Sequence, residues 1–131
     1  MTRANKTIID SSAWIEYFRA TQQGEKARKI LEESRQKIIT PNIVAAEVTS
    51  KMKRVGENYE AAIQAIKSLS IPAEETQEDY INAGTRHAEL RKKHPGISLA
   101  DAIILTIAEK NRAKILTKDA HLAGKNTILL K

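Results

Sequence analysis

The sequence predicts an α/β fold, a three-layer α/β/α sandwich built on a short and mostly parallel sheet. Short apolar runs rich in β-branched residues alternate along the chain with longer segments of helical periodicity, an order typical of parallel strands joined by right-handed crossovers. Within residues 99–108, eight of ten residues are apolar, so a helix there must be buried on nearly every side. The chain has 131 residues and shows no repeat or linker, which predicts a single domain over residues 1–131.

Composition narrows the classes of function. The absence of cysteine excludes a disulfide scaffold, a thiolate zinc site and cysteine catalysis. No signal region follows Met1 and no apolar run is long enough to cross a membrane, so we expect a cytoplasmic protein without a membrane partner. The 22 Lys and Arg residues exceed the 16 Asp and Glu residues, for a net charge of +6, and the excess gathers in residues 110–131. This asymmetry favours a polyanionic partner such as nucleic acid, although many basic proteins bind none.

The first strand is expected at residues 6–9, a β-branched run that ends at Asp10. A helix over residues 13–20 follows, and Ser11 or Ser12 can supply its N-cap. This helix carries most of the aromatic residues of the chain. We expect them to pack in the core, with a partner-binding surface as the alternative.

A second helix is expected over residues 22–34, and a second strand is expected over residues 36–40. Pro41 is expected at the first position of a third helix. The apolar stripe of that helix comprises Val44, Val48, Met52 and Val55. Glu47 lies about 100° from the centre of the stripe, at the border between the core and a cleft. The alternative for Glu47 is an ordinary solvated glutamate that pairs with Lys51.

Two later helices begin with the same capping signature, in which Ser or Thr is followed three residues later by Asp. Thr76 and Asp79 begin the helix expected over residues 76–93. Ser98 and Asp101 begin the buried helix, which follows a turn at residues 94–96. Capping is therefore one sufficient explanation for Asp101.

Three more strands and one more helix complete the expected order of elements. The helix covers residues 58–69, and residues 70–72 add a short strand after it. Residues 114–117 form a β-branched and apolar run that ends just before Asp119. Residues 127–130 are expected to close the sheet as an edge strand.

Four acidic residues are expected to converge at one edge of the sheet. Carboxyl ends of parallel strands share an edge, which brings Asp10 and Asp119 together. Asp101 begins a helix that starts at the same edge, and a carboxylate buried there costs several kcal/mol unless it is paired, hydrogen-bonded or metal-bound. Glu47 lies in the second turn of another such helix. Clustered carboxylates repel unless they are neutralised, and Mg²⁺ or Mn²⁺ suits an all-oxygen site better than zinc.

Four motifs in order resemble the PIN-domain ribonucleases, and especially the VapC-like toxins of type II toxin–antitoxin systems. The motifs are TIIDSSAWI from Thr7, a glutamate in a helix after a proline, SLADA from Ser98, and ILTKD from Ile115. The resemblance covers nearly the whole chain and implies a PIN-like fold. Leu122 departs from it, since many relatives have an aromatic residue there.

This resemblance implies an endoribonuclease that depends on Mg²⁺ or Mn²⁺ and hydrolyses RNA phosphodiester bonds. It implies a homodimer and an antitoxin protein as further partners. The implied catalytic residues are Asp10, Glu47, Asp101 and Asp119, of which Asp10, Asp101 and Asp119 hold the metal. Ser12 and Thr117 are implied as hydrogen-bonding supports.

Two sets of residues are assigned on charge and position alone. The cations expected to hold the RNA backbone flank the acids and are Lys51, Lys53, Arg54 and Lys118. His121 is expected at the surface rather than on substrate, and His87 and His94 stay unassigned.

Three other functions remain open. One is a non-catalytic RNA-binding or assembly module that retains the fold, and another is a stand-alone RNA-processing nuclease. A phosphomonoesterase of the haloacid-dehalogenase type is disfavoured because that type needs an aspartate at the position of Ser12.

Overall fold

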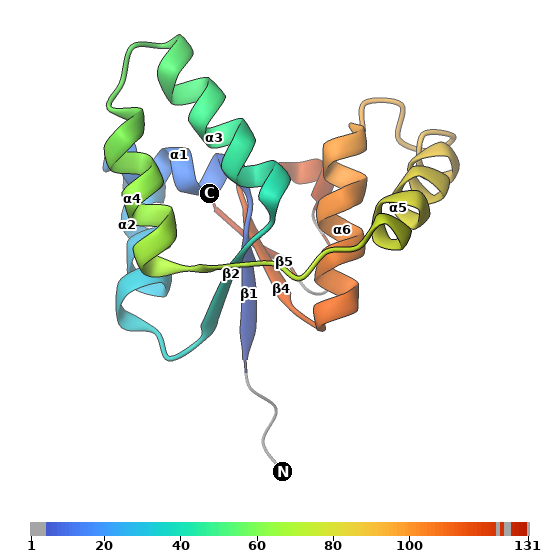
Figure 1. Ribbon diagram of the computed structural model, residues 1–131, viewed down its shortest axis with the longest axis horizontal. Helices are drawn as coiled ribbons and strands as arrows, with labels where there is room; N and C mark the ends of the chain where they lie inside the picture. The colour runs from blue at the N-terminus through green and yellow to red at the C-terminus, as the bar shows by residue number, and fades with distance from the viewer. Residues whose placement is uncertain (1–4, 123, 125–126, 131) are drawn as a thin grey trace.

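A five-stranded sheet forms the centre of the computed structural model, which describes residues 5–122, 124 and 127–130 (Figure 1). Its strands are β1 (Lys6–Ile9), β2 (Lys37–Thr40), β3 (Ile71–Pro72), β4 (Lys114–Thr117) and β5 (Thr127–Leu129). They lie in the order β3-β2-β1-β4-β5, and every pairing between the described strands is parallel. The expected strands are confirmed, and the sheet is parallel throughout its described part.

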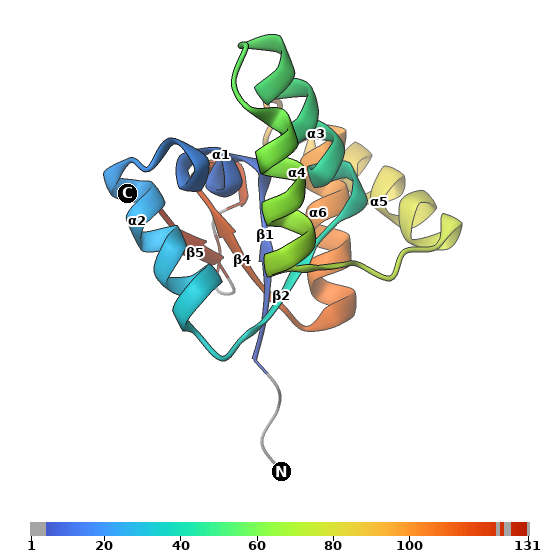
Figure 2. The same cartoon turned by 60° about the vertical axis from the view of Figure 1, so that its left-hand side comes forward.

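Helices cover both faces of this sheet. They are α1 (Ser11–Arg19), α2 (Gln22–Arg28), α3 (Asn42–Arg54), α4 (Tyr59–Leu69), α5 (Gln77–Leu90) and α6 (Leu99–Asn111). The chain moves outward from β1 to β3 and then returns past β1 to β4. Right-handed crossovers therefore place α1 to α4 on one face and α5 with α6 on the other, as Figures 1 and 2 show. The predicted three-layer sandwich is confirmed.

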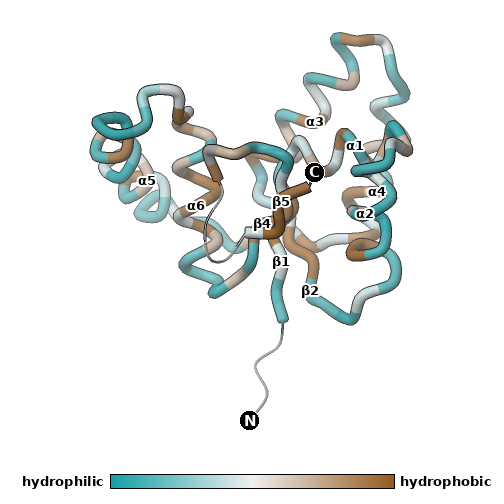
Figure 3. Tube along the Cα trace, turned by 180° about the vertical axis from the view of Figure 1, so that it is seen from behind, coloured by the Kyte–Doolittle hydropathy of each residue, from teal (hydrophilic) through white to brown (hydrophobic). Residues whose placement is uncertain are grey.

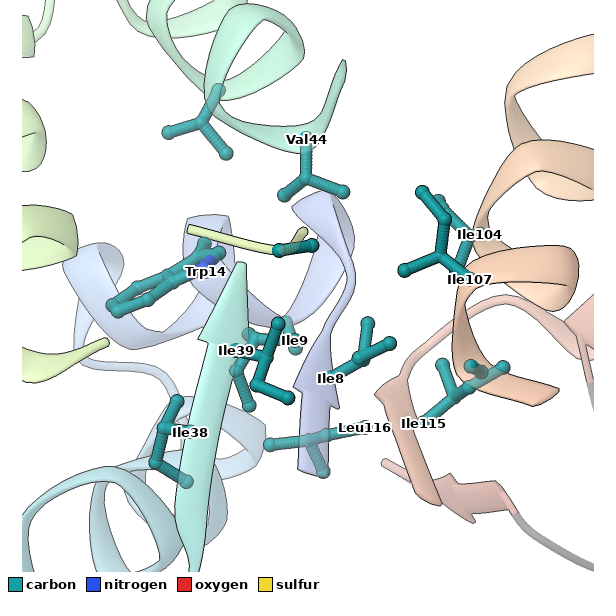
Figure 4. Packing of buried hydrophobic residues seen from close by; sticks show 14 of the residues in the cluster. Ile8, Ile9, Trp14, Ile38, Ile39, Val44, Ile104, Ile107, Ile115 and Leu116 are labelled. Carbon is teal, nitrogen blue, oxygen red and sulfur yellow. The ribbon is translucent and has the colours of Figure 1, made fainter. Parts of the chain in front are cut away.

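The core fills the space on both sides of β1. Ile8 points toward α6, where Ile104 and Ile107 are buried, and Ile9 points toward Trp14 of α1 (Figure 4). Trp14 is fully buried, and its indole Nε1 donates a hydrogen bond to Thr40 Oγ1 over 3.2 Å. Aromatic rings that satisfy their polar atoms in this way stabilise a core strongly. Core packing of the aromatic helix is thus confirmed for its largest residue.

Hydropathy follows the layers. Hydrophobic stretches run along the sheet and long hydrophilic stretches run along α5 (Figure 3). Each helix in the described part of the chain is too short or too polar to cross a membrane.

Several element boundaries differ from the expected ones. Asp10, rather than Ser11 or Ser12, is the N-cap of α1, because its carboxylate accepts a hydrogen bond from the Ser11 backbone. Pro41 is the residue before α3 and not its first residue. Val44, Val48 and Met52 form the buried stripe of α3, but Val55 follows the last residue of the helix and is 46% exposed, so its expected place in that stripe is wrong. The second expected helix ends in a π-helical turn over Lys29–Glu33. Both predicted capping boxes, at the starts of α5 and α6, are confirmed.

The carboxyl edge of the sheet collects the candidate site residues. β1 lies where the chain reverses its direction across the sheet, with β2 on one side and β4 on the other. Ligands of open α/β sheets bind outside the carboxyl ends of the strands at such a switch point. The N-terminal ends of α1, α3 and α6 lie at this edge (Figure 1).

Candidate functional site

Asp10 lies at the centre of the carboxyl edge, where β1 ends and α1 begins. It is buried, with 4% of its surface exposed. Oδ1 accepts a hydrogen bond from the Ser11 backbone over 2.8 Å, and Oδ2 accepts from the Ser12 and Thr117 hydroxyls over 3.0 and 2.6 Å. Burial raises the pKa of the Asp10 carboxyl, the three hydrogen bonds oppose that shift, and the charge of Asp101 adds to it. The carboxylate is therefore firmly oriented but not neutralised.

Two hydroxyl groups join the end of β1 to the end of β4. The Thr117 hydroxyl donates to Asp10 and accepts from the backbone N–H of Asp119 over 2.9 Å. The Ser12 hydroxyl also donates to Asp10 and accepts from the backbone N–H of Lys118 over 2.9 Å. Each hydroxyl thus uses its single proton and a lone pair in one continuous network. The network fixes the segment after β4 relative to Asp10.

Asp101 is buried at the start of α6, with 9% of its surface exposed. Its Oδ2 accepts a hydrogen bond from the Ser98 backbone over 3.1 Å, and its own backbone N–H donates to the Ser98 hydroxyl over 3.0 Å. No Lys, Arg or His in the described part of the chain forms an ion pair with Asp101. The capping box therefore accounts for its position and leaves its charge uncompensated.

Glu47 points from the second turn of α3 toward these two acids. Burial raises the pKa of its carboxyl, the charges of Asp10 and Asp101 raise it further, and a hydrogen bond from Ser11 lowers it. Its Oε1 is buried and has no hydrogen-bond partner in the described part of the chain. A buried acceptor left without a partner costs about 1–3 kcal/mol, and more when it is charged. A proton or a cation at Oε1 would remove that cost.

Asp119 follows β4 and is half-buried. Its backbone N–H donates to the Thr117 hydroxyl, and its carbonyl accepts from Leu122 over 3.1 Å. The charges that raise the pKa of Glu47 are those of Asp10 and Asp101. The charges of Asp10, Glu47 and Asp101 therefore interact with one another, and Asp119 lies at the end of the neighbouring strand, β4.

The donor set fits a hard divalent cation, although the acids stand apart. Within the described residues, no three Asp, Glu or His side chains are close enough together to hold a metal ion. Mg²⁺ commonly binds through one or two carboxylates and completes its shell with water and substrate phosphate. The unpartnered oxygen of Glu47 and the uncompensated charges of Asp10 and Asp101 match that mode of binding.

A pocket of about 610 Å³ opens beside the acids, between α1 and α3. Ser11, Ser12 and Glu47 are among the residues that line it. Its basic lining comes from Arg19, Lys51, Arg54 and Lys118. A pocket that is lined by cations and lies beside the acids suits a phosphate chain that approaches a metal site.

One of the predicted cations lies elsewhere. The ammonium group of Lys53 is 5.2 Å from the centre of the Tyr59 ring and does not line the pocket. Lys53 precedes Arg54 by one residue, so the two side chains leave the helix about 100° apart.

Sequence reasoning missed Glu16, a buried residue of α1 that also lines the pocket. Its Oε1 accepts a hydrogen bond from the Lys118 ammonium group over 2.9 Å. Glu16 lies four residues after Ser12 and therefore on the same face of the helix. A charged residue among the aromatic residues of α1 is the signal that could have drawn attention to it.

The histidines show no ligand role in the described structure. His87 Nε2 lies 3.1 Å from the Ile97 carbonyl oxygen, a contact that ties α5 to the turn before α6. His94 is exposed in that turn. The side chain of His121 is outside the described part.

Comparison with known proteins identifies relatives of the whole fold. The family model described as PIN domain matches residues 7–126. The VapC ribonuclease Mb1587 of Mycobacterium bovis and ribonuclease VapC11 of Mycobacterium tuberculosis are each 28% identical to this chain over 117 residues, which is 86% of either partner.

Solved structures agree on the fold. A toxin–antitoxin complex from Klebsiella pneumoniae matches with a TM-score of 0.69 and 21% identity, over 95% of this chain and 98% of its own. VapC20 of Mycobacterium tuberculosis, a Sarcin-Ricin loop cleaving toxin, matches with a TM-score of 0.68 and 16% identity, over 88% and 92%. VapBC2 from Rickettsia felis, bound to promoter DNA, matches with a TM-score of 0.65 and 16% identity, over 88% and 89%.

Proposed function

The chain belongs to the PIN domain family, and on that premise we propose that it is an endoribonuclease, the toxin of a toxin–antitoxin pair. Relatives named as ribonucleases support RNA as the substrate, and a neighbour with the same fold is named as a Sarcin-Ricin loop cleaving toxin. The observation that carries the proposal is the buried, unpartnered oxygen of Glu47 beside the charges of Asp10 and Asp101. These acids lie at the switch point of the sheet, where ligands bind, and a cation that neutralised them could promote phosphodiester hydrolysis.

The proposed catalytic residues are the four acids at the carboxyl edge. Asp10, Asp101 and Asp119 would hold Mg²⁺ or Mn²⁺, since all their donor atoms are oxygen. When bound, such an ion binds phosphate oxygens, lowers the pKa of a water molecule and stabilises the leaving oxygen of an in-line displacement.

Glu47, Ser12 and Thr117 have other roles: the first accepts a proton, and the other two orient Asp10. Glu47 Oε1, which lacks a hydrogen bond, accepts a proton from the attacking water. Ser12 and Thr117 hold the Asp10 carboxylate in one orientation through their hydroxyl groups. Fixed orientation matters because a misplacement of about 1 Å can cost about a hundredfold in rate.

The cations of the pocket supply affinity for RNA. Lys51, Arg54 and Lys118 line it, so neutralising Lys51 and Arg54 together should flatten the dependence of log K on log salt by about 1.4, at about 0.7 per phosphate contact on a single strand. Neutralising Lys53 should change that slope less, because its ammonium group is placed over Tyr59. Filter binding over a salt series, without divalent ion, measures both slopes.

Partners follow from the same proposal. Neighbours described as a toxin–antitoxin complex and as VapBC assemblies support an antitoxin for this chain. An acidic antitoxin segment would suit the basic lining of the pocket.

We also propose a homodimer. We propose a cytoplasmic location as well, which the cysteine-free composition suits. Light scattering of the purified chain tests the dimer, and a strictly monomeric mass contradicts it.

Incubation of the purified protein with a panel of RNAs tests the activity. We expect cleavage with Mg²⁺ or Mn²⁺, none with EDTA, and none by Asp10→Asn with either ion, while that variant keeps its fold by circular dichroism. Sequencing of the RNA ends then identifies the cleaved bond. RNA binding without any metal-dependent cleavage would instead favour the non-catalytic RNA-binding module.

A further inference from the structure

Glu16 is a buried carboxylate that the proposed chemistry does not use. Its side chain is 10% exposed, although it belongs to a helix at the edge of an open pocket. Its two oxygens have different partners: Oε1 accepts from the Lys118 ammonium group over 2.9 Å and Oε2 accepts from the Thr21 hydroxyl over 3.1 Å. The hydrogen bond from Lys118 is the main reason that the pKa of Glu16 lies below its ordinary value. Glu16 is therefore a fixed negative charge.

Lys118 is held at both ends by one face of α1. Its backbone N–H donates to the Ser12 hydroxyl over 2.9 Å. Its ammonium group donates to Glu16, which lies one helical turn after Ser12 in α1. Its side chain is 47% exposed and lines the pocket. An ammonium group has three N–H donors, so two remain for a ligand in the pocket after the bond to Glu16 is made.

The second helix holds Glu16 in place. Thr21, whose hydroxyl donates to Glu16, is the N-cap of α2 and accepts there from the backbone N–H of Gly24 over 2.9 Å. A Cβ atom at Gly24 would lie 2.0 Å from the Glu16 carbonyl oxygen. Only glycine allows α2 to approach α1 this closely, so the contact fixes the backbone of α1 at Glu16.

We propose that Glu16 is a positioning residue, which holds the Lys118 ammonium group at the mouth of the pocket to contact an RNA phosphate beside the scissile one. The inference rests on the proposed ribonuclease function. A long lysine side chain at the surface otherwise samples many rotamers. Held by Glu16, it places the phosphate chain relative to Asp10, to which Lys118 is linked through Ser12.

Stability alone does not account for this pair. The Lys118 side chain is 47% exposed, and ion pairs with so accessible a cation contribute only about 0–1 kcal/mol to stability. The carboxylate instead gives direction to a cation that faces the pocket.

The test separates turnover from binding. In Glu16→Gln, kcat for RNA cleavage should fall about tenfold, whereas the Kd for RNA without divalent ion should change less than about twofold, because Lys118 keeps its charge. Glu109→Gln is the matched control. It also removes one carboxylate from an ion pair, with Arg86, but on α6, and it should change neither quantity.

A double-mutant cycle shows whether Glu16 acts through Lys118. Lys118→Gln should weaken RNA binding, lower kcat and reduce the salt slope by about 0.7. Adding Glu16→Gln to that variant should lower kcat no further, since the partner is already gone. If the two effects multiply, or if Glu16→Gln keeps the wild-type kcat, the inference is overturned.

Lys118→Arg covers the case in which Glu16→Gln does not fold. The substitution keeps the charge at an exposed position and changes only the shape of the cation, so kcat should fall while the metal-free Kd holds. An unchanged kcat overturns the inference. If the wild-type protein cleaves RNA and these variants match it, the positioning role alone fails. If the wild-type protein cleaves none of the RNAs, the proposed function fails and the inference falls with it.

Discussion

The starts of α5 and α6 have the same local structure and opposite surroundings. In each, a hydroxyl residue and an aspartate three residues later exchange hydrogen bonds, over 2.9 and 3.2 Å at Thr76 and Asp79 and over 3.1 and 3.0 Å at Ser98 and Asp101. Asp79 also forms an ion pair of 2.7 Å with Lys110, whose hydrogen bond lowers the pKa of Asp79. Asp101 forms no ion pair with any described residue and raises the pKa of Asp10 and of Glu47.

This difference separates the capping of a helix from the chemistry of a site. Both aspartates satisfy the free N–H groups of a helix start, as any capping box does. Only Asp101 does so at the carboxyl edge of the sheet, beside other acids and without a cation. A structural acid is neutralised by the protein, whereas the acids of the proposed site leave a charge for a ligand to neutralise.

The largest expected effect is on cleavage by Asp101→Asn. An asparagine keeps an acceptor for the Ser98 backbone and loses the charge, so cleavage should fall on the order of a hundredfold to a thousandfold, with the helix retained. Asp79→Asn makes the same change in the other capping box and should cleave RNA at the wild-type rate. Single-turnover cleavage with circular dichroism of both variants measures this. Equal losses in the two variants would mean that capping, and not the charge, matters.

The second effect is stabilisation by a divalent ion. A ligand that binds only the folded state raises its stability by about 2.7 kcal/mol at a hundred times its Kd. Thermal melting with Mg²⁺ or Mn²⁺, against EDTA, should show a rise of several degrees for the wild-type protein and for Asp79→Asn. Asp101→Asn should show little or none. A wild-type Tm that changes with neither ion would contradict the proposed metal site.

Much of the fold is predictable because the signals are local. The strands end where β-branched runs meet Asp10 and Asp119, and both capping boxes follow from a spacing of three residues. The N-cap of α1 was predicted wrongly for a physical reason. Asp10 ends a strand and caps a helix at once, and the serines after it offered equally good local caps.

The electrostatic partners are not predictable in the same way. Lys110 is 31 residues from Asp79, and Lys118 is 102 residues from Glu16. Whether an acid meets such a cation depends on how helices pack and on where strands end in space, which no short pattern encodes. The four acids could be named from motifs, but the charge balance around each needed the structure.

The third effect is on the pH dependence of stability without metal. Because burial and neighbouring charges raise the pKa of Asp10 and Glu47 above 3.8 and 4.5, the folded state binds more protons than the unfolded chain just above these values. The unfolding free energy therefore falls as pH rises through that window and levels off above the folded pKa values. Asp101→Asn removes one source of the shift, so in EDTA its Tm near pH 7 should exceed that of the wild-type protein.

Asp79 should behave in the opposite way. Its pKa lies below 3.8 in the folded state, so its stabilising contribution is present above that value and is lost as pH falls through the folded pKa. Asp79→Asn should accordingly lower the Tm near pH 7. Melting of both variants from pH 3 to pH 8 checks the two signs, and a lower Tm for Asp101→Asn at neutral pH contradicts repulsion among the acids.

The smallest expected effect comes from Lys110→Gln, which makes the α5 capping box resemble that of α6 by removing its cation. The ammonium group of Lys110 also donates to the Glu74 carbonyl over 3.4 Å, and its side chain is 38% exposed. Pairs this accessible contribute little, so the Tm near pH 7 should fall by only a few degrees. Cleavage should not change, because the pair lies on α5 and α6 away from the acids. Arg86→Gln, which opens the other ion pair between these helices, is the matched control. A drop in cleavage in Lys110→Gln but not in Arg86→Gln would show that the charge at the start of α5 affects the proposed site. The distinction between a structural acid at Asp79 and a site acid at Asp101 would then be wrong.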